Sequence, residues 1–251
     1  MYQFFVAPEQ IAGNRISITG NDVNHIKNVL RMKIGEELAV SNGTDGREYR
    51  CSILSMTEDE ILCELRFIKE DAVELPVQIT LYQGLPKADK MELIIQKAVE
   101  LGAYKVVPVA TKRAVVKLDA KKEQSKRTRW QAISEAAAKQ SKRAVIPEIA
   151  PVMRFREALR EAAGMDIRLI PYEMAEDMTK TREMIRSIRP GQKVAVFIGP
   201  EGGFAEEEIA CAIENGVEPI TLGKRILRTE TAGMTVLSVL MYELEGKGEN
   251  A

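Results

Sequence analysis

Histidine and cysteine are scarce in this chain of 251 residues. It has one histidine, His25, and three cysteines, Cys51, Cys63 and Cys211, without Cys-x-x-Cys spacing. Zinc sites and Cys/His catalytic pairs need several such residues at suitable spacing, so both are disfavoured and we expect no metal. The cysteines lie among apolar neighbours, which is typical of small, reduced core residues.

Long apolar runs are also absent. No stretch approaches the roughly 20 apolar residues that span a bilayer, and residues 1–5 lack the charged start and longer apolar region of a signal peptide. Hydrophobic residues make up 45% of the chain and charged residues 29%, as in ordinary globular proteins. We therefore expect a cytoplasmic location and no membrane partner.

The chain has little net charge, −1 in total, but its charge is unevenly distributed. Residues 112–143 hold eleven lysines and arginines against Asp119, Glu123 and Glu135, a net charge of 11 − 3 = +8 that leaves −9 elsewhere. Such a segment can serve as an electrostatic footprint for a phosphate backbone. A solvated helix face explains the same charge pattern, and charge alone leaves both interpretations open.

The first part of the chain, residues 1–70, has the pattern of a small β-barrel. Short apolar segments alternate with turn residues, which is typical of hairpins; the expected strands are 15–18, 37–40, 49–54 and 61–68. One helix is expected over 22–31, capped by Asn21 or Asp22. Its apolar face consists of Val23, Ile26, Val29 and Leu30. His25 falls off this face and is expected on the surface.

After a linker at 71–76, strands alternate with helices over residues 77–251. The expected strands are 77–82, 105–109, 167–171, 194–198 and 218–222, and the expected helices are 89–101, 124–140, 155–163, 177–188, 205–215 and 229–244. This alternation predicts a mainly parallel sheet with helices on both faces. Such sheets bind ligands beyond the carboxyl ends of their strands.

One glycine-rich loop, 199–203, follows an apolar strand at such an end. Its glycines allow a tight turn and leave main-chain groups accessible to a ligand. It is not a P-loop and does not fit the G-x-G-x-x-G pattern, and Glu201 would repel a pyrophosphate. The loop therefore favours a neutral or cationic ligand, such as an adenosine, although a plain glycine-rich connector remains the alternative.

A second loop leads from the strand 218–222 into the last helix. Ile226 and Leu227 offer apolar contact there, and Thr229 is a candidate helix cap. Arg228 stays charged and presents donors in a planar fork that could fix an anionic oxygen. Pairing of Arg228 with Glu230 or Glu201 on the surface is the alternative.

Several segments together carry a family resemblance over nearly the whole chain. They are 25–32, 83–92, 96–102, Arg129-Trp130, 139–143 and the two loops at 199–203 and 221–232. With these motifs the chain resembles the SPOUT class of S-adenosylmethionine-dependent RNA methyltransferases. Within that class it most resembles the bacterial 16S ribosomal RNA uridine-N3 methyltransferase family.

The resemblance implies an α/β fold, with a SPOUT-type mainly parallel sheet, a C-terminal trefoil knot and a preceding PUA-like β-barrel. It implies S-adenosyl-L-methionine as the cofactor, a homodimer, and 16S ribosomal RNA in an assembled small subunit as the partner. Cofactor contacts are expected from Pro171, Tyr172, Glu173, Ile198, Gly199, Pro200, Glu201, Gly202, Leu222, Gly223, Ile226, Leu227, Arg228, Thr229 and Ala232.

Methylation at N3 of uracil requires loss of the N3 proton, so a site must accept that proton or stabilise the ring anion. Our hypothesis assigns charge stabilisation to Arg228, with Glu201 or Glu230 orienting it or accepting the proton. RNA phosphate contacts are expected from Arg31, Lys33, Arg47, Lys112, Arg113 and Arg143. A SPOUT enzyme acting on another base or a ribose 2′-hydroxyl, and a non-catalytic RNA-binding protein, are the alternatives.

Overall fold

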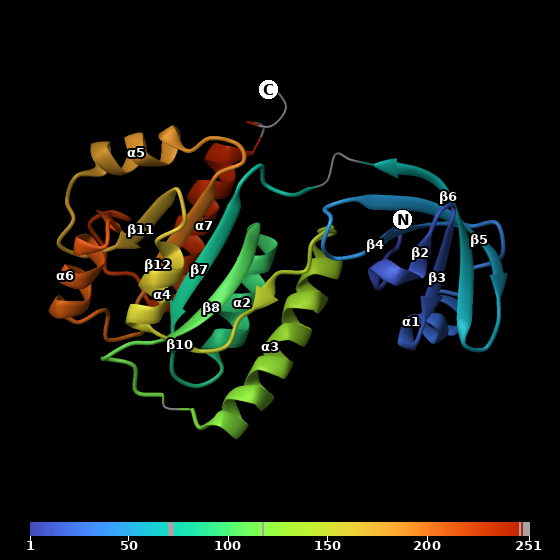
Figure 1. The fold of residues 1–251 in the computed structure, drawn as a ribbon, viewed down its shortest axis with the longest axis horizontal. Coiled ribbons are helices and arrows are strands. Elements are labelled where there is room, and N and C mark those ends of the chain that lie inside the picture. The colour runs from blue at the N-terminus through green and yellow to red at the C-terminus, as the bar shows by residue number, and fades with distance from the viewer. Residues whose placement is uncertain (70–72, 117, 246, 248–251) are drawn as a thin grey trace. The chain divides into compact units, whose positions relative to one another are not determined.

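The structure is a computed structural model that describes residues 1–69, 73–116, 118–245 and 247 (Figure 1). The chain divides into two compact units, one of Met1–Glu74 with Ala138–Ile146 and one of Leu75–Ala137 with Pro147–Ala251. The expected linker, 71–76, lies partly outside the described residues. The grouping of Ala138–Ile146 with the first unit is not anticipated by the sequence, because nothing local marks a return of the chain.

The first unit contains a six-stranded mixed sheet in the order β1-β4-β5-β6-β3-β2. Its elements are β1 (Gln3–Phe5), η1 (Pro8–Gln10), β2 (Ile11–Ala12), β3 (Arg15–Thr19), α1 (Asn21–Asn24), η2 (His25–Val29), β4 (Glu37–Ser41), β5 (Glu48–Met56) and β6 (Glu60–Lys69). β1 and β4 pair in parallel, and the other pairs are antiparallel. All four expected strands are present, within one or two residues of their expected bounds.

The single expected helix of this unit is wrong in two respects. It begins at Asn21 after Gly20, without a side-chain cap, and its second half is a π-helix over His25–Val29. The wider π turn rotates later side chains relative to a regular α-helix. Val29, expected on the apolar face, is therefore 61% exposed, while Val23 and Ile26 are buried as expected. His25 is exposed, as expected.

The second unit is built of alternating strands and helices. Its elements are β7 (Gln78–Gly84), α2 (Lys90–Glu100), β8 (Ala103–Ala110), α3 (Ala120–Gln140, whose last residues group with the first unit), β9 (Glu148–Ile149), β10 (Met153–Arg154), α4 (Phe155–Ala162), β11 (Ile167–Pro171), α5 (Met178–Ser187), β12 (Lys193–Ile198), α6 (Glu206–Glu214), β13 (Glu218–Ile220) and α7 (Thr229–Leu244). None of these helices is long and apolar enough to cross a bilayer, within the described part of the chain.

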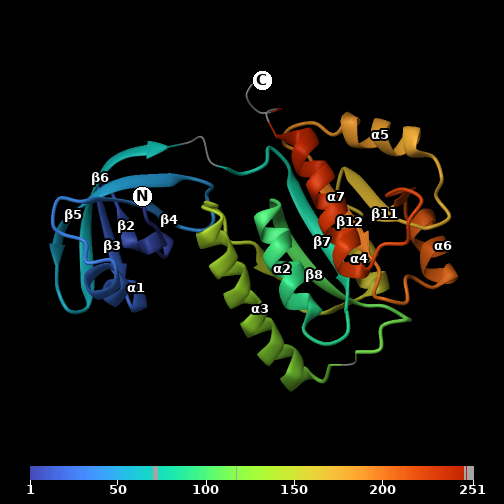
Figure 2. The same cartoon turned by 180° about the vertical axis from the view of Figure 1, so that it is seen from behind.

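The seven strands of this unit form one sheet in the order β10-β8-β7-β12-β11-β13, with β9 beside β8. All the pairings are parallel, which confirms the expected parallel sheet. Figure 2 shows α2 and α7 on one face, and Figure 1 shows α4 on the other. The strand order does not by itself define how the chain is threaded, so the trefoil knot stays a prediction.

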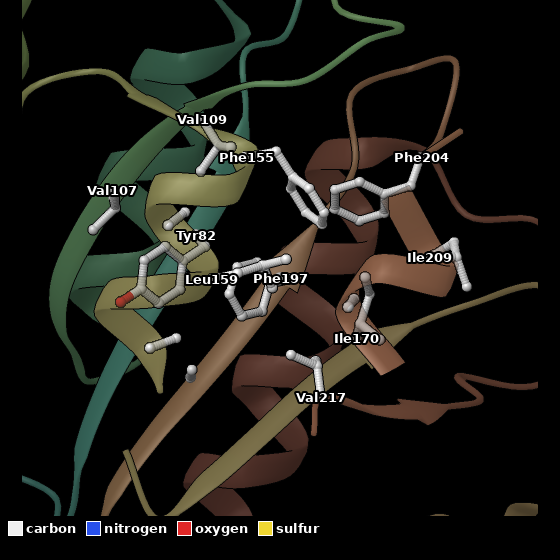
Figure 3. Close-up of a cluster of buried hydrophobic side chains, with 14 of the residues drawn as sticks. Tyr82, Val107, Val109, Phe155, Leu159, Ile170, Phe197, Phe204, Ile209 and Val217 are labelled. Carbon is white, nitrogen blue, oxygen red and sulfur yellow. The ribbon is translucent and has the colours of Figure 1, made fainter. Parts of the chain in front are cut away.

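A cluster of aromatic side chains supports the sheet on the α4 face (Figure 3). Tyr82 of β7 stacks on Phe197 of β12, with ring centroids 4.5 Å apart, and the ring of Phe155 meets Phe197 edge-on at 6.1 Å. Phe204, which follows the first glycine-rich loop, packs against Phe155 at 5.3 Å. The cluster thus anchors the far end of that loop to the core.

The cysteines lie as the sequence predicts. Cys51 and Cys63 are buried in the core of the first unit, and Cys211 is partly buried against the aromatic cluster. All three are free thiols.

Candidate functional site

A pocket of about 270 Å³ lies at the carboxyl ends of β11, β12 and β13. Its wall combines four segments that are far apart in the sequence: Arg113 after β8, the end of β11, the loop after β12, and the loop after β13 with the start of α7. The lining residues are Arg113, Pro171, Tyr172, Glu173, Ile198, Gly199, Pro200, Glu201, Gly202, Gly203, Phe204, Thr221, Leu222, Gly223, Arg225, Ile226, Leu227, Thr229 and Ala232. Every expected cofactor-binding residue except Arg228 lies in this wall.

Five lining residues are missed by the sequence interpretation: Arg113, Gly203, Phe204, Thr221 and Arg225. Thr221 belongs to the loop because β13 ends at Ile220, two residues earlier than expected. Gly203 is the last residue of the first loop, and Phe204 directly follows it. Position within the two loops is the signal that points to these four residues, whereas no local signal connects Arg113 to them.

Glycine is required at several points in the first loop and beside it. A Cβ on Gly84, at the end of β7, would lie 2.7 Å from the backbone nitrogen of Pro200, so β7 can approach the loop only without a side chain there. A Cβ on Gly199 would lie 3.1 Å from Gly203, and Gly203 has a φ of +66°. The loop is therefore folded tightly on itself, and its main chain forms much of the pocket wall.

Thr229 is not the cap of the last helix. Arg228 occupies the N-cap position of α7, and Thr229 is its first residue. The Thr229 hydroxyl donates to the carbonyl of Gly199 at 2.6 Å and accepts from the amide Nε2 of buried Gln83 at 2.8 Å. The hydroxyl thereby joins the start of α7 to the loop after β12 and to the end of β7.

The segment after β8 forms one rim of the pocket. Arg113 donates from Nη1 to the carbonyl of Gly202 at 3.1 Å, and the side chain of Lys112 pairs with Glu207. The backbone N–H of Lys112 donates to buried Glu208 at 2.8 Å, while the other Glu208 oxygen accepts from Ala205 N at 2.9 Å. Glu208 thus caps α6 and holds this rim beside the loop.

Three charged side chains meet beside the pocket. Lys90, the first residue of α2, lies 3.2 Å from a carboxylate oxygen of Glu201 and 3.2 Å from one of Glu230. Glu201 also accepts from the backbone N–H of Lys87 at 3.0 Å. Partial burial alone would raise the pKa of Glu201, but hydrogen bonds from backbone N–H groups and Lys90 hold that pKa below its usual range.

Lys90 shows the complementary effect. Desolvation alone would lower its pKa, but the hydrogen bonds to Glu201 and Glu230 raise it above the ordinary value. Lys90 and Glu201 are therefore both charged at neutral pH. Within the described residues, no group of three or more histidine, cysteine, aspartate or glutamate side chains is placed to hold a metal ion.

Arg228 is exposed and does not line the pocket. Its backbone carbonyl accepts from Ala232 N in the first turn of α7. The alternative pairing with Glu201 or Glu230 is not found, because both carboxylates pair with Lys90 instead. The guanidinium therefore stays accessible to another molecule beside the pocket.

One of the six expected RNA contacts is wrong. Arg143 is 3% exposed, and its guanidinium pairs with Glu74, with Nε 3.1 Å from a carboxylate oxygen. The same carboxylate accepts from the backbone N–H groups of Ala144 and Val145. Arg143 thus stabilises the first unit from within and does not face phosphate. The other five candidates, Arg31, Lys33, Arg47, Lys112 and Arg113, are exposed.

Both units match models of known families. Residues 73–241 match an RNA methyltransferase domain, and residues 18–66 match an RNA methyltransferase PUA domain. Together the two matches account for most of the chain. They also agree with the parallel sheet and the mixed sheet seen here.

Relatives similar over their full length agree with these models. The chain is 38% identical over 232 residues to ribosomal RNA small subunit methyltransferase E of Bacillus subtilis, covering 91% of this chain and 90% of that one. The Neisseria gonorrhoeae enzyme of that name, solved bound to S-adenosyl methionine, is 30% identical with a TM-score of 0.80, over 96% and 97% of the chains.

A Legionella pneumophila methyltransferase in complex with the cofactor SAM is 33% identical, with a TM-score of 0.80 over 96% of each chain. The sequence motifs, the two domain matches and the full-length similarity all point the same way. The chain therefore belongs to the ribosomal RNA small subunit methyltransferase E family, within the SPOUT class of RNA methyltransferases.

Proposed function

We propose that this protein transfers a methyl group from S-adenosyl-L-methionine to N3 of a uridine in the 16S ribosomal RNA of the small subunit. The observation that carries this proposal is the pocket, which joins both glycine-rich loops and the end of β11 at one edge of the parallel sheet. Relatives that align over more than nine-tenths of the chain are named for methylation of small-subunit ribosomal RNA. One of these, from Neisseria gonorrhoeae, and the Legionella pneumophila methyltransferase were solved with this cofactor bound.

The residues of the pocket fit S-adenosylmethionine. Ile198, Leu222 and Leu227 offer apolar surface for an adenine ring, and the loops between them present main-chain donors and acceptors. Glu173 and Glu201 are compatible with the cationic sulfonium, and Arg113 and Arg225 with the carboxylate of the cofactor. When bound, the cofactor supplies an electrophilic methyl group on a sulfonium.

Arg228 is the residue proposed to stabilise the uracil anion. Its guanidinium is exposed and lies at the start of α7, next to pocket residues Leu227 and Thr229. A fixed cation there would stabilise negative charge that develops on a uracil carbonyl oxygen. Glu201 is a weak proton acceptor because its pKa is held low. Glu230 is the other carboxylate proposed to orient Arg228 or to accept the proton.

RNA contacts are proposed in both units. Arg31, Lys33 and Arg47 are exposed in the first unit, and Lys112 and Arg113 are exposed beside the pocket in the second. Basic side chains of this kind hold phosphates and give affinities that fall with salt. A uracil presented by folded RNA, as in an assembled small subunit, suits this arrangement because its N3 must be exposed for reaction.

A homodimer is proposed from the apolar outer face of α7. Tyr242 and Val239 on that helix are 85% and 43% exposed, and Ile226 at the pocket lip is 87% exposed. Exposed apolar side chains near a site are typical of a surface that another chain covers. The SPOUT trefoil knot and a cytoplasmic location belong to the same proposal.

The product of the reaction distinguishes this proposal from its alternatives. Small subunits from cells lacking the protein would be incubated with it and S-adenosylmethionine, and the digested RNA analysed by mass spectrometry. We expect one new 3-methyluridine. A methyl group on another base or on a ribose 2′-hydroxyl would contradict the N3 assignment, and a protein without cofactor binding in calorimetry would be a non-catalytic RNA-binding protein.

A further inference from the structure

The bridge from Glu201 through Lys90 to Glu230 connects three separate elements at the edge of the pocket. Lys90 begins α2, Glu201 lies in the loop after β12, and Glu230 lies in the first turn of α7. The ammonium is 3.2 Å from each carboxylate. Glu201 lines the pocket, whereas Lys90 and Glu230 lie outside its wall.

The position of Lys90 on its own helix is electrostatically unfavourable. The N-terminus of an α-helix carries a partial positive charge, which favours carboxylates in the first turn and disfavours cations. Local helix chemistry therefore does not explain a lysine at this position. The two carboxylates from other elements stabilise it there, which indicates that its role is tertiary.

The turn before α2 reinforces the bridge. The backbone N–H of Lys87 also donates to Glu201, at 3.0 Å. Ala88 has a φ of +54°, a conformation that non-glycine residues rarely adopt. The chain adopts this turn while presenting both the Lys87 N–H and the Lys90 ammonium to one carboxylate. Glu201 is therefore held from one side by the β7–α2 connection.

Removing the ammonium would leave two carboxylates around a site that held a single cation. Like charges at such short range repel, so either the loop and α7 separate or one carboxylate takes up a proton. Both outcomes change the pocket wall, since Glu201 lines it and Glu230 directly follows the lining residue Thr229. They also change the position of Arg228, the N-cap of α7.

We propose that Lys90 is a positioning residue for methyl transfer, which fixes the loop after β12 against the start of α7 through Glu201 and Glu230. This inference rests on the proposed function. Lys90 acts through the two carboxylates, because its ion pairs with them align the pocket wall with Arg228. Its loss affects the reaction more than the folding of the second unit.

Five charged residues bear on the pH dependence of this arrangement. Lys90 comes from α2, Glu201 from the loop after β12 and Glu230 from α7, while Arg113 and Arg228 lie on adjoining segments. In the native protein the pKa of Glu201 is held low. Without Lys90, Glu201 loses a hydrogen bond and a positive charge that lower its pKa, so it titrates at higher pH, and activity decreases on the acid side where the native enzyme still works.

The test compares Lys90→Met with Lys90→Arg, which keeps the charge. We expect Lys90→Met to lower kcat by about 10- to 100-fold, the scale at which misplacement of reacting groups acts. Its acid limb should move to higher pH, and Lys90→Arg should recover most of the rate. The matched control is Lys97→Met on the same helix, where Lys97 pairs with Glu100 outside the pocket wall.

Two outcomes overturn the proposal. One is a Lys90→Met protein with the kcat and pH profile of the native enzyme, and the other is an equal loss in Lys97→Met. If Lys90→Met does not fold, Lys90→Gln removes the same charge, and the same changes in kcat and pH profile are expected of it. Failure of the native protein to methylate RNA would instead reject the proposed function, and calorimetric S-adenosylmethionine binding by each variant separates the two cases.

Discussion

The hydroxyl of Thr229 donates to the carbonyl of Gly199 at 2.6 Å, across 30 residues of sequence. The same oxygen accepts from Gln83 Nε2, and both side chains are buried. One side chain therefore links the two glycine-rich loops to each other and to the core of the sheet. Because the loops form opposite parts of one pocket, this link sets the spacing of its walls.

Replacing Thr229 with valine keeps the shape of the side chain and removes both hydrogen bonds. The Gly199 carbonyl would lose its bond from the hydroxyl, and the buried Gln83 amide would keep only its bond to the carbonyl of Gly84, so we expect a loss of about 1–3 kcal/mol in the free energy of unfolding. Calorimetry should show weaker binding of S-adenosylmethionine.

The control for this change is Thr235→Val on the same helix. The Thr235 hydroxyl donates to the carbonyl of Thr231, one turn earlier, and neither residue lines the pocket. It should change stability and binding little. Equal behaviour of the two variants in chemical denaturation and calorimetry would refute a special role for Thr229.

Arg228→Ala tests charge stabilisation at the uracil. Removing a preorganised donor to a developing oxyanion costs about 10²–10³ in rate, so we expect a loss of this size in single-turnover methylation. Cofactor affinity should stay unchanged, because Arg228 is not in the pocket wall. Lys224→Ala, in the same loop and also outside the wall, is the control. A native rate in Arg228→Ala would remove this arginine from the mechanism.

Local sequence patterns predict the helices and strands well, because the spacing of apolar residues depends on the local backbone conformation. The apolar run 194–198 and the 3.6-residue spacing over 229–244 correspond to β12 and α7 within one residue. The parallel direction of the strands also follows from the sequence, because strands that alternate with helices have few other arrangements. Val29 was misplaced because a π-helix changes the period at a point that the residue types do not mark.

The charged contacts were harder to predict because their partners are remote in sequence. Arg143 lies in a basic segment, and only the folded chain brings Glu74 to it. Lys90 belongs to a motif that carried the resemblance, yet its two carboxylates come from positions 201 and 230. The sequence shows where charged residues lie, but it does not distinguish a residue in a buried ion pair from one that is exposed to a ligand.

Arg143→Met should destabilise the first unit without directly changing the affinity for RNA. The change leaves Glu74 partly buried beside an apolar side chain, and breaking a buried pair from one side costs about 3 kcal/mol or more. We expect an earlier urea midpoint for the first unit. Arg143→Met with Glu74→Gln should recover part of this loss, because no carboxylate is left unpaired. A stable single variant with reduced RNA affinity would return Arg143 to the RNA interface.

The lowered pKa of Glu201 predicts that the stability of the protein depends on pH in the acid range. The pKa of this carboxyl is lowered in the folded protein, so its contribution to stability is present above the unfolded value, near 4.5, and is lost as the pH falls through the folded value. Thermal unfolding from about pH 6 down to about pH 3 should show a smaller decrease in Tm for Glu201→Gln than for the native protein. Parallel curves for the two proteins would contradict the low pKa.

The affinity for RNA should decrease as the salt concentration rises, and the steepness of the decrease should report the number of phosphate contacts. Each lysine or arginine that neutralises a phosphate contributes about one unit to the slope of log affinity against log salt. Arg31→Ala, Lys33→Ala and Arg47→Ala, made singly, should each reduce that slope by about one unit and leave the methylated position unchanged.

Lys180→Ala is the control for these variants. Lys180 is an exposed cation that pairs with Glu218 and is not an expected RNA contact, so its slope should match that of the native protein. Filter binding to small subunits over a range of potassium chloride concentrations measures all four slopes. Native slopes in the three variants would move the phosphate contacts away from the first unit, and an affinity independent of salt would exclude phosphate contacts as the source of binding.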